Sequence, residues 1–119
     1  MIDRNYFSHS IPPDGHSVFD ELIAMGYCFS VAGENIGWNT YPDGSDTQAM
    51  FDTFMASATH KANILGTDWT KIGVGAYQGS TDKKIWTVLF SLPCGSGPTP
   101  SPTPAPTATP TPKIGRAHV

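Results

Sequence analysis

The sequence predicts an α+β domain, with helices in the first half of the chain and a small antiparallel sheet towards the end of the domain. Apolar residues recur at helical spacing over residues 18–25 and again over residues 46–58. Residues 71–77 and 84–91 instead favour strands, and the short polar segment between them is typical of the connection in an antiparallel pair. Helical segments that precede a run of strands favour the α+β class.

The first complete helix has a clear start signal. We interpret residues 1–7 as the last turns of an N-terminal helix that is truncated, and residues 8–15 as a turn rich in proline and glycine. Ser17 precedes the next helix, and Asp20 lies three residues further on, which predicts a capping box. The side of this helix that we expect to face the core consists of Val18, Phe19, Leu22, Ile23 and Met25.

A short strand and a longer helix are predicted to follow. We expect residues 27–32 to form a loop and residues 33–38 to form the strand. Ser45 and Gln48 have the spacing of a capping box for the longer helix, and His60 is expected at or just beyond a bend at its end. The buried side of this helix is expected to contain Met50, Phe51, Phe54 and Met55.

Composition divides the chain into one domain and two further segments. Residues 1–96 have the mixture of apolar and polar residues that a small core requires. Residues 97–112 hold seven of the eleven prolines, alternating mainly with threonine, and we interpret them as an extended extracellular linker. Residues 113–119 abandon this pattern abruptly and resemble a translated sequencing adapter, so we interpret them as a non-native tail.

Charge and hydropathy argue against nucleic-acid binding and against a membrane-spanning helix. The formal net charge is −3, and no run of lysine and arginine interleaved with aromatic residues occurs, so nucleic acid is not an expected partner. No apolar stretch approaches the roughly 18 residues that a transmembrane helix requires. We therefore expect a monomeric domain without a transmembrane segment, which binds a small molecule, a lipid or another protein.

The two cysteines lie 66 residues apart, and neither belongs to a Cys-x-x-Cys motif. Two thiols alone cannot form a structural zinc site. Because the linker composition indicates an extracellular protein, we expect a disulfide between Cys28 and Cys94, which would stabilise the fold by about 4 kcal/mol on the chain-entropy model. The alternative is a pair of buried free thiols.

Three residues far apart in the sequence are candidates for one functional site. Glu34 and Asn35 lie side by side between Gly33 and Gly37, with apolar residues on both sides, so the carboxylate is expected to be held in a defined direction. His9 and His60 could join it through folding. Two neutral imidazoles could bind Zn²⁺ or another divalent metal, with the glutamate as ligand or as base for bound water.

Two other interpretations of this site stay open. Glu34 could fix the tautomer of one histidine without any metal, or each histidine could simply satisfy buried backbone groups. A hydrolase could instead use Ser57 or Ser8 as nucleophile, with His60 or His9 as base.

The residues around these candidates are expected to have supporting roles. Asn35 and Asn63 are expected to lock neighbouring loops through hydrogen bonds, and Ser57 to cap a turn. His16 is expected to be solvated. Trp38, Trp69, Trp86 and Tyr77 are expected to pack in the core and at its rim, or to line an apolar groove for a lipid.

Four blocks of residues, taken in order, resemble the bacterial SCP-like branch of the CAP superfamily (cysteine-rich secretory protein, antigen 5 and pathogenesis-related 1). The likeness extends over about residues 1–92, and the blocks are Asn5-Tyr6-Phe7-Ser8-His9 with Asp14-Gly15; Gly33-Glu34-Asn35-Ile36; His60-Lys61-Ala62-Asn63-Ile64-Leu65; and Ile72-Gly73-Val74-Gly75 before the strand from Trp86 to Phe90. The resemblance implies an α-β-α sandwich with a central cleft lined by two histidines and two acidic residues.

Carried over to this chain, the resemblance assigns the two histidines to His9 and His60 and the first acid to Glu34. The second acid of the eukaryotic members falls near Ser57, so the set is incomplete here. Members of the family are mostly secreted, and some bind divalent metals, sterols or fatty acids. We therefore expect a secreted or cell-wall-associated binding module in preference to an enzyme. A metal-dependent hydrolase that uses His9, Glu34 and His60 is the alternative.

Overall fold

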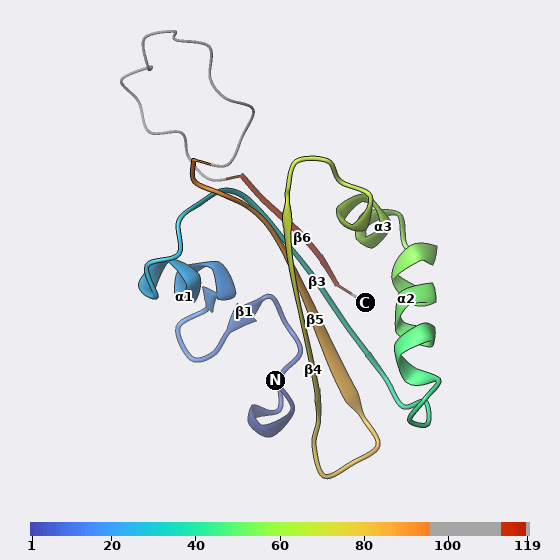
Figure 1. Ribbon diagram of the computed structural model, residues 1–119. Helices are drawn as coiled ribbons and strands as arrows, with labels where there is room; N and C mark the ends of the chain where they lie inside the picture. Colours follow the sequence, from blue (N-terminus) through green and yellow to red (C-terminus); the bar gives the residue numbers. More distant parts are fainter. Residues whose placement is uncertain (96–112, 119) are drawn as a thin grey trace, which may run out of the picture.

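The computed structural model describes residues 1–95 and 113–118, which form three layers (Figure 1). A sheet of four strands lies in the middle, with helices α2 and α3 on one face. Helix α1 and the two-stranded hairpin β1–β2 lie on the other. The α+β class and the sandwich architecture are thus confirmed. The linker predicted over residues 97–112 lies outside the described residues.

The central sheet has the strand order β4-β5-β3-β6. Strands β3 (Phe29–Asn39), β4 (Lys71–Gln78) and β5 (Lys84–Pro93) pair antiparallel, as the alternation in the sequence predicted for β4 and β5. The prediction of a loop over residues 27–32 is wrong from Phe29 onwards, because β3 already begins there. Strand β6 (Lys113–His118) pairs with β3 in parallel and was not predicted.

The helices are α1 (Val18–Ala24), α2 (Asp46–Ala56) and α3 (Ala58–Ile64), and a short 3-10 helix, η1 (Ile2–Arg4), begins the chain. The predicted capping box of α1 is present, because the Ser17 side chain accepts from the Asp20 backbone while the Asp20 carboxylate accepts from that of Ser17. The capping box predicted at Ser45 is absent, since the Ser45 hydroxyl donates to the Pro42 carbonyl instead. Within residues 1–7 the structure forms one turn of 3-10 helix, η1. In the described part of the chain, no helix has the length and apolar character that crossing a bilayer requires.

Successive side chains of β3 point to opposite faces of the sheet. Gly37 faces α2 so closely that an added Cβ atom would lie 2.4 Å from Sδ of Met50 and 2.8 Å from a ring carbon of Phe54. Glycine here permits the helix to pack directly on the sheet. Phe54 and Met50 are buried as predicted, whereas Phe51 is exposed.

The opposite face of the sheet carries a second apolar cluster. Phe19 of α1 packs there against Phe29 and Ala32 of β3, with Val18, Leu22, Tyr27 and Leu89 around them. Ile23 and Met25, which were expected to face the core, are exposed, because α1 covers this face with one side only.

A disulfide closes one end of the antiparallel β3–β5 pair. Cys28 lies just before β3 and Cys94 just after β5, with their Cα atoms 5.3 Å apart. The backbone N–H of Cys94 also donates to the carbonyl of Cys28 at 3.0 Å. The link therefore closes the long segment that contains α2, α3 and β4.

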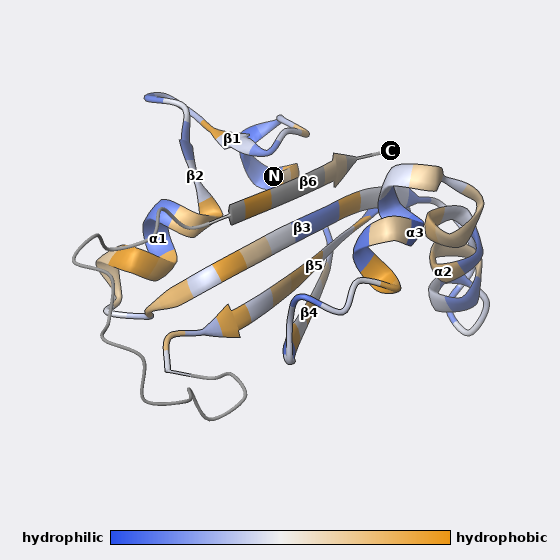
Figure 2. Cartoon of the chain, turned by 90° about the horizontal axis from the view of Figure 1, so that it is seen from above, coloured by the Kyte–Doolittle hydropathy of each residue, from blue (hydrophilic) through white to orange (hydrophobic). Residues whose placement is uncertain are grey.

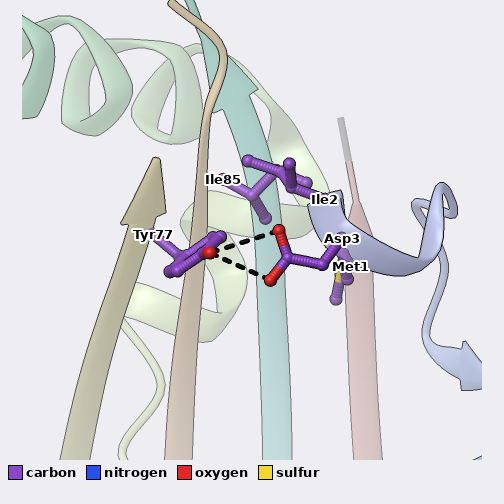
Figure 3. A pocket seen from close by; sticks show the side chains of 5 residues that line it. All are labelled: Met1, Ile2, Asp3, Tyr77 and Ile85. Carbon is purple, nitrogen blue, oxygen red and sulfur yellow. Dashed lines mark hydrogen bonds between the residues drawn. The ribbon is translucent and has the colours of Figure 1, made fainter. Parts of the chain in front are cut away.

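The start of the chain packs against the far end of the β4–β5 pair. Figure 3 shows a small pocket between η1 and these strands, in which the Tyr77 hydroxyl donates to both carboxylate oxygens of Asp3, at 2.9 and 3.2 Å. Hydrogen bonding to the Asp3 carboxylate raises the pKa of Tyr77 above its ordinary value. Strand β4 itself is exposed along its whole length, because it forms the outer edge of the sheet.

Candidate functional site

His9 and Glu34 form a hydrogen-bonded pair in the domain interior. Nδ1 of His9 lies 2.6 Å from Oε1 of Glu34, and the two side chains are 14% and 2% exposed. Strand β3 directs the Glu34 side chain to the face covered by the hairpin of β1 (Ser10–Ile11) and β2 (His16–Ser17), and His9 immediately precedes β1. The hairpin thus brings the histidine to the carboxylate.

The pair fixes the state of the imidazole. When the Glu34 carboxylate is ionised it only accepts hydrogen bonds, and Nδ1 of His9 is then the donor. The other ring nitrogen, Nε2, is buried. The Glu34 carboxylate therefore holds the His9 ring in one orientation. This is the arrangement expected if the glutamate fixes the tautomer of a histidine without a metal.

Asn35, the next residue of β3, connects the sheet to α3 on the opposite face. Its side-chain nitrogen donates to the backbone carbonyl of His60 at 3.0 Å, and its side-chain oxygen accepts from Nδ2 of Asn63 at 2.7 Å. The Asn63 amide also lies 3.5 Å from the carbonyl of Glu34. Both carboxamides are buried, so these hydrogen bonds hold α3 to the strand that carries Glu34.

His60 lies in α3 and is almost completely buried. Its Nδ1 atom lies 2.7 Å from the Ser57 hydroxyl, and its ring stacks on Phe54 with 5.0 Å between ring centres and 17° between planes. Ser57 occupies the N-cap position of α3, but its side chain makes no cap hydrogen bond to the backbone. Ser57, near which the family resemblance places a second acid, therefore contacts His60 through a hydroxyl.

The structure brings together two of the three candidate residues, His9 and Glu34, and engages His60 with Ser57. Among residues 1–95 and 113–118, no group of three or more His, Cys, Asp and Glu side chains could hold a metal ion. A zinc site needs at least three protein ligands around one point.

His16, which was expected to be solvated, is 31% exposed and lies between two exposed carboxylates. Its Nδ1 lies 2.5 Å from Oδ1 of Asp14, and its Nε2 lies 2.8 Å from Oε1 of Glu21 on α1. Hydrogen bonds to Asp14 and then Glu21 raise the pKa of His16, and the bond to His16 lowers the pKa of Asp14. This exposed bridge ties the turn before β2 to the first turn of α1.

An open apolar groove of about 230 Å³ lies between the α2–α3 layer and strands β4 and β5. An apolar groove for a lipid was one of the two interpretations left open for Trp86 and the other aromatic residues, but its location was not predicted. Exposed Phe51, Ile72 and Val74 lie among the groove residues. The complete lining consists of Thr47, Met50, Phe51, Phe54, Ile64, Ile72, Val74, Trp86, Val88 and Phe90. The apolar side of the strand over residues 71–77 was the signal in the sequence, but alternation alone does not tell whether a strand face is covered.

Comparison with known proteins agrees with this arrangement. Residues 1–90 match the family model described as CAP, Cysteine-rich secretory protein family. Two similar proteins of Bacillus subtilis (strain 168) are the uncharacterized protein YkwD, 37% identical over 91 residues, and the uncharacterized membrane protein YlbC, 37% identical over 90 residues. Each alignment covers 76% of this chain.

The chain spans only 32% of the length of YkwD and 23% of that of YlbC. No solved structure matches it. The family model nevertheless covers most of the chain, including His9, Glu34 and His60. The chain belongs to the CAP family of cysteine-rich secretory proteins.

Proposed function

We propose that this domain is an extracellular binding module that takes a small apolar ligand, such as a single acyl chain, into the groove between α2–α3 and strands β4–β5. The observation that carries this proposal is the groove itself. Nine of its ten lining residues are apolar, Thr47 being the exception. Apolar clefts with few polar groups are typical of sites for apolar small molecules.

The size and exposure of the groove support a small ligand. A volume of about 230 Å³ is below the range of roughly 300–1,000 Å³ that drug-sized ligands occupy. Ile72 and Val74 are 65% and 64% exposed, so water covers apolar surface that a ligand would bury. Burial of such surface favours binding by about 25 cal/mol per Å². A slender aliphatic chain fits these limits better than a rigid ring system.

The proposed location is outside the cell, either free or at the cell wall. Three features support it: the Pro/Thr linker over residues 97–112, the disulfide between Cys28 and Cys94, and membership of a family of secretory proteins. Disulfides persist in oxidising compartments. The linker composition is that of extracellular stalks.

The experiment that tests the proposal is a titration of the full chain with cis-parinaric acid, a fatty acid whose fluorescence rises in apolar surroundings. We expect a saturable rise. Val74→Glu should weaken binding about tenfold or more, because it introduces a carboxylate into the apolar groove. Ile23→Glu is the matched control, since Ile23 is similarly exposed (57%) but lies on α1, across the sheet. No saturable rise, or the same affinity in parent and Val74→Glu, would overturn the proposal.

The alternative is a metal-dependent hydrolase, and the pair of His9 and Glu34 is the observation that favours it. A carboxylate bound to one ring nitrogen orients the other towards a metal in many centres. In this chain such a centre would use Nε2 of His9 and of His60, because both Nδ1 atoms already have partners. The described arrangement does not unite these atoms with a third ligand.

Calorimetry with Zn²⁺ separates the two functions. We expect no saturable heat in the micromolar range from the full chain at pH 7.5. Micromolar binding that is abolished by His9→Ala and by His60→Ala, but kept by His16→Ala, would establish the metal centre and favour the hydrolase. The His16 variant is the control because that histidine belongs to the exposed bridge with Asp14 and Glu21.

A further inference from the structure

The outer edge of β3 accepts a strand in this structure. Strand β6 runs parallel to β3, and the six paired positions extend from Val31 with Lys113 to Ile36 with His118. Figure 2 shows β6 beside β3, on the side away from β5. Without β6, the main-chain groups on this side of β3 would have no strand partner.

The accepted strand lies directly beside the residues of the candidate site. Arg116 is in register with Glu34, and Ala117 is in register with Asn35. Residues in register share a face of the sheet, so Ala117 lies on the same side as α3, whereas Ile114, three residues earlier, lies on the other. Their exposed fractions differ accordingly: Ala117 is 6% exposed and Ile114 is 44% exposed.

We infer that the edge formed by Val31 to Ile36 is an interaction surface that binds an extended peptide by parallel strand addition. Main-chain hydrogen bonds supply the affinity of such contacts, and the pockets for alternate side chains supply the specificity. The partner is therefore an extended segment with a small residue at the position in register with Asn35, because α3 packs over that position. On the other face, where Ile114 is 44% exposed, the partner can carry a larger side chain at the position in register with Ala32.

In the present chain the C-terminal segment occupies this edge. The segment is connected to the domain through the proline-rich residues 97–112, and a tethered strand reaches an effective concentration in the millimolar range. A free peptide must displace it. The accepting edge belongs to the domain, so the inference does not depend on whether residues 113–119 are native. It also does not depend on the proposed function, because no residue of β3 lines the apolar groove.

The test uses the full chain with Ile114→Pro and Ala117→Pro. Alternate residues of an edge strand donate to its neighbour, and proline cannot donate, so one of these two substitutions removes a hydrogen bond to β3. A fluorescein-labelled peptide with the sequence of residues 111–119 is then titrated, with fluorescence anisotropy as the readout. We expect saturable binding to the proline variant and at least tenfold weaker binding to the intact chain.

Two altered peptides test the proposed geometry. Ala117→Trp in the peptide should weaken binding at least tenfold, because the indole cannot fit under α3, while Ile114→Trp, on the exposed face, should bind like the parent peptide. Equal binding by the two altered peptides would overturn the inference. Equal binding of the parent peptide to the intact chain and to the proline variant would also overturn it.

Hydrogen exchange shows whether the proline variant is still folded. We expect those amides of β3 between Val31 and Ile36 that point to β6 to lose protection in the variant while those that point to β5 keep it, and the free peptide to restore the lost protection. A folded variant that binds no peptide would overturn the inference. Dimerisation of the variant with newly protected β3 amides would also overturn it, since the occupant would then be a second copy of the chain.

Discussion

Asn63 donates its side-chain amide to the side-chain oxygen of Asn35 at 2.7 Å, which joins α3 to the strand that carries Glu34. Asn35 in turn donates to the backbone of α3 at His60, so the two carboxamides form a continuous buried connection. Buried polar groups that lose their partners are costly, while a fully bonded network holds one arrangement. The orientation of α3 relative to β3 therefore depends on these two side chains.

Removal of the Asn35 side chain should destabilise the domain by about 1–3 kcal/mol, because the carbonyl of His60 and the amide of Asn63 would lose their partner. Urea unfolding of Asn35→Ala, Asn63→Ala and the double variant measures this effect. The coupling energy of this cycle should be about 0.5–3 kcal/mol. If the two single effects simply add, the residues do not act as one network.

Gly37→Ala should destabilise the fold by about 1–3 kcal/mol through overpacking. The new methyl group would lie 2.4 Å from Met50, which can move, and 2.8 Å from Phe54, whose ring is stacked on His60. Gly73→Ala on β4 is the matched control, since no atom lies within 4 Å of its added Cβ. Urea unfolding should show the loss for Gly37→Ala and little change for the control. Similar values for both variants would mean that α2 can shift away from the sheet.

The sequence predicted those parts of the fold that depend on local patterns. The capping box of α1 and the antiparallel pair of β4 and β5 follow from residues close together in the chain. The failures have long-range causes. The bulge between Phe29 and Val31 lets β3 begin earlier than its alternation indicates, and the exposure of Phe51 depends on which face of the sheet is covered.

The candidate site was likewise predicted only in part. The glycines around Glu34 and the position of His9 indicated that a carboxylate and an imidazole could meet, and the hairpin of β1 and β2 brings them together. The partner of His60 could not be chosen from sequence alone. Ser57 is three residues away, a distance that suits a helix cap as well as a hydrogen bond to the ring, and the structure forms the second.

The bridge of His16 with Asp14 and Glu21 should make stability depend on pH. The pKa of His16 is raised from 6.5, so its contribution is complete below pH 6.5 and is lost as the pH rises through the higher folded value. The pKa of Asp14 is lowered from 3.8, so its contribution is complete above pH 3.8 and is lost as the pH falls through the lower folded value. The bridge therefore stabilises the domain most between these two values.

Thermal melts of the parent chain and His16→Gln across pH 4 to 9 check this prediction. The melting temperature of the variant should be lower than that of the parent at pH 5, and the difference should shrink as the pH rises above 6.5. Thr67→Ala, at an exposed uncharged position, is the control, and its difference from the parent should not change with pH. A difference for His16→Gln that is constant across this range would contradict the bridge.

Reduction of the disulfide between Cys28 and Cys94 should destabilise the domain by about 4 kcal/mol, because the unfolded chain would regain the freedom of a loop of 66 residues. Urea unfolding with and without dithiothreitol measures this loss. The variant Cys28→Ser with Cys94→Ser controls for other effects of the reductant and should unfold identically under both conditions. An unchanged midpoint for the parent after complete reduction, confirmed by thiol titration, would rule out this contribution.

Strand β4 has a consequence for the behaviour of the protein at high concentration. Its outer backbone groups have no neighbouring strand among the described residues, and its side chains, including Ile72 and Val74, are exposed. Natural sheets protect such margins with charged residues, proline or bulges. Here Lys71 provides a single charge at one end, and Gly73 and Gly75 weaken the strand without shielding it. Self-association at high protein concentration should therefore begin at β4. The substitution Val74→Lys should suppress it, because it places a charge on this edge strand.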